Sequence, residues 1–402
     1  MAATSTTRAL SRIAIIGGGP GGLALRLTLA KRGIPATIYE RETDSTSRAH
    51  MGGMLDLEWE TGQRALRENG MEDLFKKYSR RDAQEMRLAG KDGVTLLKRE
   101  EPASEEGDLK NERPEIDRRV LREILLDAVP KDSVKWGHAL TAIRPLDNGE
   151  HELTFANGLV TVTDLVVGAD GANSRLRPLL SSAVPLYHGI TGAELSLAPS
   201  VAALPENRDI SDGVGKGTCG VLEDEKVITF QRNGDGRIRA YMWFRGDADW
   251  KLPSDPKAAK QVMLDTYADW APWVRRFIEQ ADESAIYRRP LHYLPVGHRW
   301  DHKPGVTLIG DAAHLMSPYA GAGANLAMGD GLDLCFVIAE AVAKGLGREE
   351  VEAAIAAWEE KMFEQAGQYA FISKKSVELS FGPGTPHSAV KGFAKYLEQA
   401  RK

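Results

Sequence analysis

The segment IAIIGGGPGGLALRLTLAKRGIPATIYE, residues 13–40, decides the fold. A short apolar run from Arg12 to Ile16 predicts a strand, a glycine cluster follows it, and a helical pattern extends from Gly21 to Arg32. Ala36 to Tyr39 then predicts a second strand. This order of strand, tight turn, helix and strand within a single short segment is the pattern of a βαβ unit that binds a dinucleotide.

Three glycines of this segment, Gly17, Gly19 and Gly22, match the G-x-G-x-x-G motif. The first allows the tight turn, the second lets the backbone approach a pyrophosphate, and the third packs the helix on the strand. Glu40 ends the second strand, where an acid accepts hydrogen bonds from ribose hydroxyls, and Arg41 follows it. This pair of residues does not distinguish NAD from FAD. The alternative is a glycine-rich turn that binds no ligand, with a carboxylate that faces solvent.

The composition is that of a globular protein and limits the possible functions. The chain has 402 residues, 42% hydrophobic and 27% charged, with a net charge of -5 and no dense basic block, so nucleic acid is not expected as a partner. Cys219 and Cys335 cannot form a disulfide framework and lack metal-ligand spacing, so no metal site is predicted. No apolar run approaches the length that crosses a membrane, and Met1 to Ser11 is not a secretory signal. We therefore expect a cytoplasmic protein, as a monomer, without a membrane partner.

The order of the predicted elements indicates an α/β architecture in which α/β segments flank a β-rich middle. We expect one continuous helix over residues 257–280, and another from Glu349 to about Lys375 with a looser tail after it. The predicted fold is a Rossmann-like nucleotide-binding domain built from separated segments, an inserted β-sheet domain and a C-terminal helix. The boundaries are 1–78, 106–182 and 285–345 for the nucleotide-binding domain, 79–105 and 183–284 for the substrate domain, and 346–402 for the bridging helix and tail.

A second motif, GDAAHLMSPYAGAGAN over residues 310–325, follows an apolar strand at 306–309. It resembles the second flavin fingerprint of the para-hydroxybenzoate-hydroxylase-like (class A) FAD monooxygenases. The resemblance implies that Asp311 accepts hydrogen bonds from ribityl hydroxyls and that Gly321 and Gly323 let backbone N–H groups reach the flavin. The helix that starts near Asn325 would point its positive end at the reduced flavin. The alternative is a strand-to-helix loop in which Asp311 caps the helix.

Two further segments match the same family. Residues 168–177 resemble its D-G motif, so Asp170 is expected to contact FAD; the alternative is a turn that Asp170 caps. Arg118 and Arg122 lie one helical turn apart, and family members keep such a pair whose first arginine reaches the flavin. The alternative for both arginines is a solvated helix face.

A closer resemblance is to the TetX-type tetracycline-inactivating monooxygenases. It rests on Gly52-Gly53-Met54-Leu55-Asp56-Leu57, on Pro114-Glu115-Ile116-Asp117-Arg118 and on residues 310–325. It implies that Asp56 contacts FAD and that an arginine before the Gly52-Gly53 pair contacts NADPH. Arg48 is the arginine nearest to that place, displaced by one residue, with Ala49 at the matching position.

The expected substrate wall departs from this family. Where the relatives bind tetracycline with Gln, Arg, Asn and His, this chain has Gly192, Thr218, Gln231 and Arg239, of which only Gln231 is a near match. Pro318 and Gly321, expected to touch substrate beside the flavin, are present. Arg239 could hold a substrate oxyanion. A related polycyclic enol or phenol therefore stays open as the substrate.

The resemblance implies a single-component enzyme that uses FAD, NADPH and O2 and transfers oxygen through a flavin C4a-hydroperoxide, since no second G-x-G-x-x-G is present. Tetracycline inactivation is the leading expectation. An aromatic hydroxylase of a secondary-metabolite pathway acting on another polyketide-like phenol is the alternative, and a non-catalytic partner-binding protein a remote one. No catalytic base is predicted. We expect purely structural roles for five residues: His314, Met316, Tyr267, Trp270 and Trp273.

Overall fold

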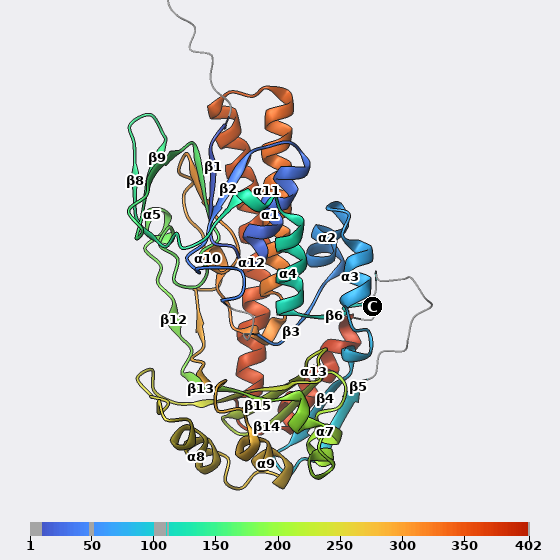
Figure 1. The fold of residues 1–402 in the computed structure, drawn as a ribbon. Coiled ribbons are helices and arrows are strands. Elements are labelled where there is room, and N and C mark those ends of the chain that lie inside the picture. The colour runs from blue at the N-terminus through green and yellow to red at the C-terminus, as the bar shows by residue number, and fades with distance from the viewer. Residues whose placement is uncertain (1–9, 48–51, 100–109, 111, 401–402) are drawn as a thin grey trace, which may run out of the picture.

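The protein is described by a computed structural model over residues 10–47, 52–99, 110 and 112–400. Two sheet-based regions lie one above the other, and the long helix α12 (Arg348–Ser380) runs along both (Figure 1). This arrangement confirms the predicted α/β fold with a Rossmann-like region, a second sheet region and a C-terminal helix. No helix among the described residues is both long and apolar enough to cross a bilayer.

The upper region contains a five-stranded parallel sheet whose strand order is β19-β11-β1-β2-β7. Its central strands are apolar and buried along their whole length, as expected of a parallel sheet covered on both faces. The carboxyl ends of β1, β11 and β19 meet at one edge, where the glycine turn, the D-G turn and the Gly310 turn begin. The strands are β1 (Ile13–Ile16), β2 (Ala36–Tyr39), β7 (Val134–Lys135), β11 (Leu165–Gly168) and β19 (Val306–Leu308).

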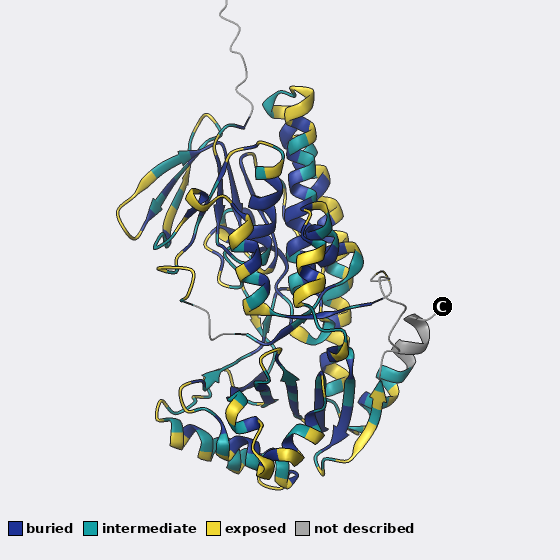
Figure 2. Ribbon diagram, turned by 45° about the vertical axis from the view of Figure 1, so that its right-hand side comes forward, coloured by how far each residue is buried: buried dark blue, intermediate teal, exposed yellow. Residues whose placement is uncertain are grey.

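Helices cover one face of this sheet and a three-stranded meander covers the other (Figure 1). The helices α1 and α11 touch along glycines: a β-carbon at Gly21 would lie 2.7 Å from the carbonyl oxygen of Ala327, and one at Gly331 would lie 2.6 Å from that of Gly21. Figure 2 shows the burial of these helices. The elements are α1 (Pro20–Lys31), α4 (Arg118–Ala128), α11 (Gly323–Lys344), β8 (Leu140–Pro145), β9 (His151–Phe155) and β10 (Val160–Thr163).

The lower region is a seven-stranded, mostly antiparallel sheet of order β17-β13-β16-β15-β14-β4-β5. Side chains alternate along it: Cys219 and Val221 belong to the core under the helices, whereas Thr218 and Gly220 line a cavity on the other face. The strands are β4 (Met86–Gly90), β5 (Thr95–Arg99), β13 (Ile190–Leu197), β14 (Thr218–Glu223), β15 (Lys226–Arg232), β16 (Ile238–Arg245) and β17 (Tyr287–Arg288).

The predicted continuous helix over 257–280 is wrong, because the chain forms α8 (Pro256–Thr266) and α9 (Pro272–Gln280) instead. Pro272 has no N–H to donate and disfavours helical backbone at Ala271, which is extended with φ −48° and ψ 143°. Between the helices, Tyr267 and Trp270 stack edge-to-face with their ring centres 4.7 Å apart in the core, which confirms their structural role.

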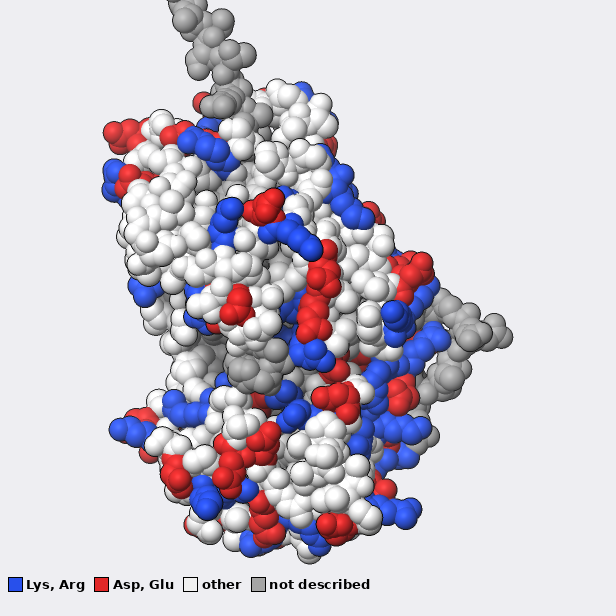
Figure 3. Space-filling view, in the orientation of Figure 1, with Lys and Arg blue, Asp and Glu red and all other residues white. Residues whose placement is uncertain are grey.

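The prediction of a looser tail after Lys375 is also wrong. Helix α12 continues to Ser380, and a further helix, α13 (His387–Ala400), follows it. Phe381 is buried in a cluster with Leu88 and Trp243 of the lower sheet, which explains why the chain stays ordered beyond the predicted end. Lys, Arg, Asp and Glu residues are interspersed over the face shown in Figure 3.

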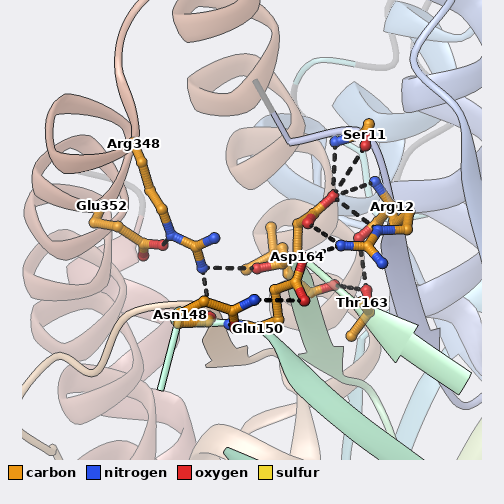
Figure 4. Close-up of polar contacts among 10 residues, drawn as sticks. Ser11, Arg12, Asn148, Glu150, Thr163, Asp164, Arg348 and Glu352 are labelled. Carbon is orange, nitrogen blue, oxygen red and sulfur yellow. Dashed lines mark hydrogen bonds and ion pairs between the residues drawn. The ribbon is translucent and has the colours of Figure 1, made fainter. Parts of the chain in front are cut away.

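The start of α12 is anchored to the upper sheet by a polar network (Figure 4). Asp164 accepts hydrogen bonds from the backbone N–H groups of Ser11 and Arg12, at 3.0 and 2.8 Å, and pairs with the Arg12 guanidinium at 2.7 Å. Arg12 also pairs with Glu150. Arg348 donates to the carbonyl oxygens of Gly149, at 2.5 Å, and Asp164, at 3.2 Å. One cluster therefore holds the first strand, the meander and the long helix together.

A second anchor of α12 is His302, which lies between two glutamates of that helix. The Nε2–Oε2 distance to Glu352 is 3.2 Å and the Nδ1–Oε2 distance to Glu359 is 2.8 Å. Hydrogen bonds to Glu352 and Glu359 raise the pKa of His302 to about 9, against about 6.5 in an unfolded chain. Because the folded pKa is the higher one, the stabilisation is complete below about pH 6.5 and is lost as pH rises through about 9.

We therefore expect the free energy of unfolding to fall by roughly 3 kcal/mol as His302 loses its proton. Urea unfolding at about pH 6 and about pH 9.5 measures this fall. His302→Gln keeps a polar side chain without the titration, so its unfolding free energy should be lower at acidic pH and change less over the same range. An equal fall in both proteins would contradict the assignment.

Candidate functional site

A cavity of about 1630 Å³ lies between the upper and lower regions. One end is lined by the turns at the edge of the parallel sheet, and the other by the face of the lower sheet and the last turns of α12. Pockets for a single drug-sized ligand measure roughly 300–1,000 Å³. The cavity therefore has room for a large cofactor together with a second molecule.

The glycine turn after β1 forms part of the wall. Gly17 has φ +109°, and a β-carbon there would lie 2.3 Å from the carbonyl oxygen of Ala169, so the turn requires glycine. A β-carbon at Gly22 would lie 2.2 Å from the carbonyl oxygen of Gly17. At Gly19 nothing lies within 4 Å, because this residue faces the open cavity. The three glycines thus have the three different surroundings that a pyrophosphate-binding turn needs.

Glu40 lines the same end of the cavity and is buried. One carboxylate oxygen accepts the N–H of Gly18 at 2.6 Å and the other accepts the N–H of Glu42 at 3.1 Å. The carboxylate is therefore held by backbone, with lone pairs left for ribose hydroxyls. Arg41 also lines the cavity but is largely exposed, 3.5 Å from Glu42.

Asp311 is the clearest acceptor in the cavity. Its carboxylate faces the open volume, and no described residue donates a hydrogen bond to it, so it does not act as a helix cap. The many atoms around the side chain raise its pKa, while His314, Arg118 and Arg177 oppose the rise, although the carboxylate itself is exposed to the cavity. An acceptor that is open to the cavity and has no protein partner fits the hydroxyl groups of a ribityl chain.

The turn that presents Asp311 is fixed from behind by Asp330 of α11. One oxygen of Asp330 accepts the Nε2–H of His314 at 2.7 Å and the N–H of Gly310 at 2.9 Å. His314 is buried and does not line the cavity. Its contacts are those of a residue that holds the turn in place, as the sequence predicted.

Arg177 joins the D-G turn to the Asp311 turn. Its guanidinium donates to the carbonyl oxygens of Ala312 and Ala172, each at 2.8 Å, and of Asp311 at 3.1 Å. Asp170 lines the cavity and also accepts the N–H of Arg175 at 2.7 Å, so the turn-capping role and the cavity-facing position occur together. Its second oxygen is buried without a hydrogen bond.

The two arginines of α4, Arg118 and Arg122, have different surroundings. Arg118 lines the cavity and packs so tightly on Gly52 that a β-carbon there would lie 2.6 Å from the Arg118 Cδ. Arg122 does not line the cavity; it donates to the carbonyl oxygen of Ser45 at 2.6 Å and lies over the ring of Trp136. Arg122 therefore supports the loop after β2. Arg48 lies outside the described residues.

The loop at 318–324 borders both ends of the cavity, through Pro318, Gly321 and Gly323, and Met316 also lines the wall. Asn325 departs from the expected cofactor contact. It is buried, its Oδ1 accepts the N–H of Glu58 at 2.8 Å, and its Nδ2 donates to the carbonyl oxygen of Asp56 at 2.8 Å. This side chain joins the Asp56 strand to α11 and does not line the cavity.

Asp56 lies on the short strand β3 (Met54–Asp56), which pairs with β6 (Glu115–Asp117). Its carboxylate is 2.6 Å from the Arg113 guanidinium. Burial raises the pKa of Asp56 to about 6 against the opposing charge of Arg113. Burial, with the Asp56 charge beside it, raises the pKa of Glu115 to about 8. All three residues line the cavity.

The lower sheet presents an aromatic wall. Tyr241 and Trp243 stack with ring centres 5.4 Å apart and planes 14° apart. Thr218 and Gln231, which the sequence suggested as substrate contacts, line the same wall. The Gln231 Oε1 accepts a hydrogen bond from the N–H of Met54 at 3.1 Å, and the Tyr241 hydroxyl oxygen accepts one from the N–H of Gly53 at 3.1 Å. These bonds attach the Gly53 segment to the sheet.

Two expected wall residues lie elsewhere. Gly192 is buried on β13 beside its neighbour β16 in the sheet, where a β-carbon would lie 1.9 Å from the carbonyl oxygen of Met242, so glycine serves close packing there. Arg239 lines a separate pocket of about 390 Å³, and its guanidinium is 2.9 Å from the buried Glu194. By strand alternation Arg239 shares a face of β16 with Tyr241 and Trp243, but it lies nearer the start of the strand and outside the cavity.

The cavity residues that were not singled out from the sequence include Arg113, Glu115, Tyr241 and Trp243. Tyr241 and Trp243 could have been found from the alternation of the strand at 238–245, which places both on one face. Glu115 and Arg113 have no such signal, because they reach the cavity only through the pairing of β6 with β3.

Comparisons with known proteins agree with this geometry. A family model described as "FAD binding domain" matches residues 11–354. Monooxygenase asqM of Emericella nidulans is 29% identical, over 92% of this chain and 95% of its own. The 3-amino-4-hydroxybenzoate 2-monooxygenase PtmB3 of Streptomyces platensis is 31% identical, over 79% of this chain and 77% of its own. Tetracycline destructase Tet(51) shares the fold, with a TM-score of 0.69 and 17% identity over 97% of this chain and 96% of that one.

Proposed function

Because this chain belongs to the FAD-binding-domain family of class A flavin monooxygenases, we propose that it hydroxylates a flat, electron-rich phenol or enol, with NADPH as electron donor. The observation that carries the proposal is the aromatic wall of Tyr241 and Trp243, which faces the same cavity as the cofactor turns. The sequence alone favoured tetracycline. The relatives named above favour the alternative, an aromatic hydroxylase acting on another phenol.

The residues at the upper end of the cavity fit FAD. The turn at Gly17, Gly19 and Gly22 would hold the pyrophosphate, Glu40 the ribose and Asp311 the ribityl hydroxyls. The loop at Gly321 to Ala324 and the start of α11 would border the isoalloxazine. When bound, reduced FAD supplies the activated oxygen that is inserted into substrate. The chain's own part is to bind, orient and exclude water.

The lower end fits a planar ring. Tyr241 and Trp243 offer stacking surface, and Tyr319 lies across from Trp243 with ring centres 5.7 Å apart. Hydrogen-bonding groups of the lower sheet that line the cavity include Thr218, Thr229 and the Nε2 of Gln231. Arg289 and Lys375 also line it. One observation argues against tetracycline as the substrate. Gly192 and Arg239 stand at two of the positions expected to contact it, and both lie outside this wall.

The test is NADPH oxidation by the FAD-loaded protein with a monocyclic hydroxybenzoate, an aminohydroxybenzoate, a naphthol and tetracycline. Faster oxidation with a phenolic compound, and a product heavier by one oxygen atom, is the expected result. Oxidation that is stimulated by tetracycline alone would overturn the proposed substrate class. A protein that binds FAD but gives no oxygenated product with any aromatic compound would overturn the proposed reaction.

A substitution in the aromatic wall should weaken substrate binding without changing FAD binding. Thr229 lies on β15 and is half-buried against the substrate end. Thr229→Phe adds a ring to the open volume, and we expect KM for the phenolic substrate to rise at least about tenfold, equivalent to about 1.4 kcal/mol. Fluorescence titration should show unchanged FAD affinity. Thr218→Phe, on the neighbouring strand β14 of the same wall, is the matched comparison. A loss of FAD binding in the Thr229 variant would contradict the assignment.

A further inference from the structure

Two carboxyl groups stand side by side at the cavity wall. In the antiparallel pairing of β3 with β6, Asp56 is directly opposite Glu115. Directly opposed residues place their β-carbons about 4.5–5.5 Å apart on one face of a sheet. Both line the cavity, on strands separated by nearly sixty residues of sequence.

The two carboxyl groups have different partners. Asp56 is 2.6 Å from the Arg113 guanidinium, which is also 3.0 Å from Glu58. Glu115 has no ion pair among the described residues, and its Oε2 is buried without a hydrogen bond although the side chain lines the cavity. The residue is only 9% exposed. An unpaired carboxylate at such a place is costly, whereas a carboxylic acid is not.

The other charged groups nearby do not neutralise Glu115. Arg80 donates to the carbonyl oxygens of Arg232 and Lys216 and is 3.2 Å from Asp82. Asp117, on the same strand, carries a negative charge and accepts from the N–H of Gly234 at 3.0 Å. The cluster of Asp56, Glu58 and Glu115 therefore has three carboxyl groups around one guanidinium, that of Arg113.

The cluster reaches the loop where substrate and cofactor meet. A β-carbon at Gly321 would lie 3.4 Å from the Arg113 Nη2 and 3.4 Å from the Asp56 Oδ1. A substrate hydroxyl beside Gly321 would thus lie near a carboxylate that can accept its proton and a guanidinium that can stabilise the resulting oxyanion.

We propose that Asp56 and Glu115 form a carboxyl pair that holds one proton at neutral pH and takes up a second one from the hydroxyl of the bound phenol or enol. In this step the substrate O–H bond breaks and an O–H bond forms on Asp56. The negative charge passes to the substrate oxygen beside Arg113, and nothing is oxidised or reduced. Asp56 is the acceptor, and Glu115 is a positioning residue that acts through Asp56 by remaining uncharged. This inference rests on the proposed function.

The directions of the pKa shifts agree with this division. Burial raises the pKa of Glu115 into the range where it is protonated at neutral pH, and the charge of Asp56 adds to the rise. Burial also raises the pKa of Asp56, but Arg113 opposes the rise, which leaves Asp56 ionised and only moderately acidic. Above the pKa of Glu115 the pair carries two negative charges, which disfavours a phenolate next to it.

The experiment uses 4-nitrophenol as the probe, because its ionised form absorbs visible light. It is bound to the FAD-loaded protein without NADPH, so that no turnover occurs. In the wild type at about pH 6, the bound probe should be more ionised than the free probe, and its dissociation constant should rise about tenfold between about pH 7 and about pH 9. Infrared spectra of the wild-type protein should show the carbonyl band of a protonated carboxylic acid at neutral pH. This measurement requires no variant.

The variants separate the two roles. Asp56→Asn should remove the extra ionisation of the bound probe. Glu115→Gln should keep it but abolish the loss of affinity at high pH, and Glu115→Asp should restore that loss. Glu112→Gln is the matched control, because Glu112 is a buried glutamate of the same segment that pairs with Arg81 at 2.7 Å and does not line the cavity. It should keep the wild-type pH profile.

A Glu115→Gln protein that still loses affinity at high pH, or a wild type without the carboxylic acid band, would overturn the proton pair. These readings do not depend on oxygen transfer. If the pair behaves as expected but no phenol is oxygenated, the proposed function fails and the pair stands. If phenols are oxygenated while the pH profile of probe binding is unchanged in Glu115→Gln, only the proton pair fails.

Discussion

Replacing Gly19 with alanine is expected to weaken FAD binding by about 10- to 100-fold while the protein without FAD keeps its stability. Gly19 has φ −78° and ψ 179°, which alanine adopts without strain, and a β-carbon there meets nothing within 4 Å. The empty space is where the pyrophosphate must approach the backbone, so a methyl group displaces the phosphate from the N–H groups of α1. Hydrogen bonds to a charged group contribute about 1.5–3 kcal/mol each. Titration of FAD fluorescence and thermal unfolding of the protein without FAD measure the two effects.

Gly17→Ala is the matched comparison, because Gly17 belongs to the same turn but its substitution should lower folding stability. Its β-carbon would lie 2.3 Å from the carbonyl oxygen and 2.8 Å from the carbonyl carbon of Ala169, and φ is +109°. Both neighbours are backbone atoms at the end of β11, which cannot move away as a flexible side chain could. We expect a loss of at least about 3 kcal/mol of folding free energy. If Gly19→Ala lowers the melting temperature of the FAD-free protein as far as Gly17→Ala does, the assignment of Gly19 to the pyrophosphate is wrong.

The second large effect is expected at Asp311. Asp311→Asn preserves the shape of the side chain but removes the charge from an acceptor that faces the cavity without a protein partner. We expect the dissociation constant for FAD to rise about 10- to 100-fold, because charge-assisted hydrogen bonds to ribityl hydroxyls become weaker and one oxygen becomes a donor. Equilibrium dialysis of the flavin gives the constant directly.

Asp330→Asn provides the contrast for Asp311, because the two carboxylates flank the same turn from opposite sides. Asp330 is buried, pairs with His314 at 2.7 Å and accepts the N–H of Gly310 at 2.9 Å. Its loss leaves the buried His314 without its charge partner, so we expect the stability of the folded protein to fall by about 3 kcal/mol. A stable Asp330 variant with impaired flavin affinity, paired with an unstable Asp311 variant, would reverse the two assignments.

The turns that line the upper end of the cavity could be located from the sequence because they follow buried strands and contain glycine. Gly17 follows a buried strand with φ +109°, and Gly310, with φ +61°, precedes the helix that begins at Asp311, so both turns have a glycine signal in the local sequence. Such signals lie within a few residues of one another. The same reasoning located the parallel strands, whose continuous apolar runs differ from the alternating lower sheet.

The substrate end could not be predicted in this way, because its residues meet only through long-range pairing. Glu115 reaches the cavity through β3, and Arg239 leaves it although it shares a strand with Tyr241. Asn325 belongs to the predicted motif, yet its amide is fully used in joining two segments more than 260 residues apart. The break before Pro272 was visible in the sequence but was outweighed by the helical periodicity on both sides.

The continuity of α12 limits how the enzyme can admit a substrate. Its 33 residues form one helix of about 50 Å. The first turns are tied to the upper sheet through Arg348 and Glu352, and Phe371, Ile372 and Leu379 near the other end line the cavity. A hinge opening of the two regions would have to bend or detach this helix, so we expect the two regions to keep their spacing when a ligand binds. New substrate preferences can then arise by substitutions in the final turns of a single helix, without disturbing the dinucleotide fold.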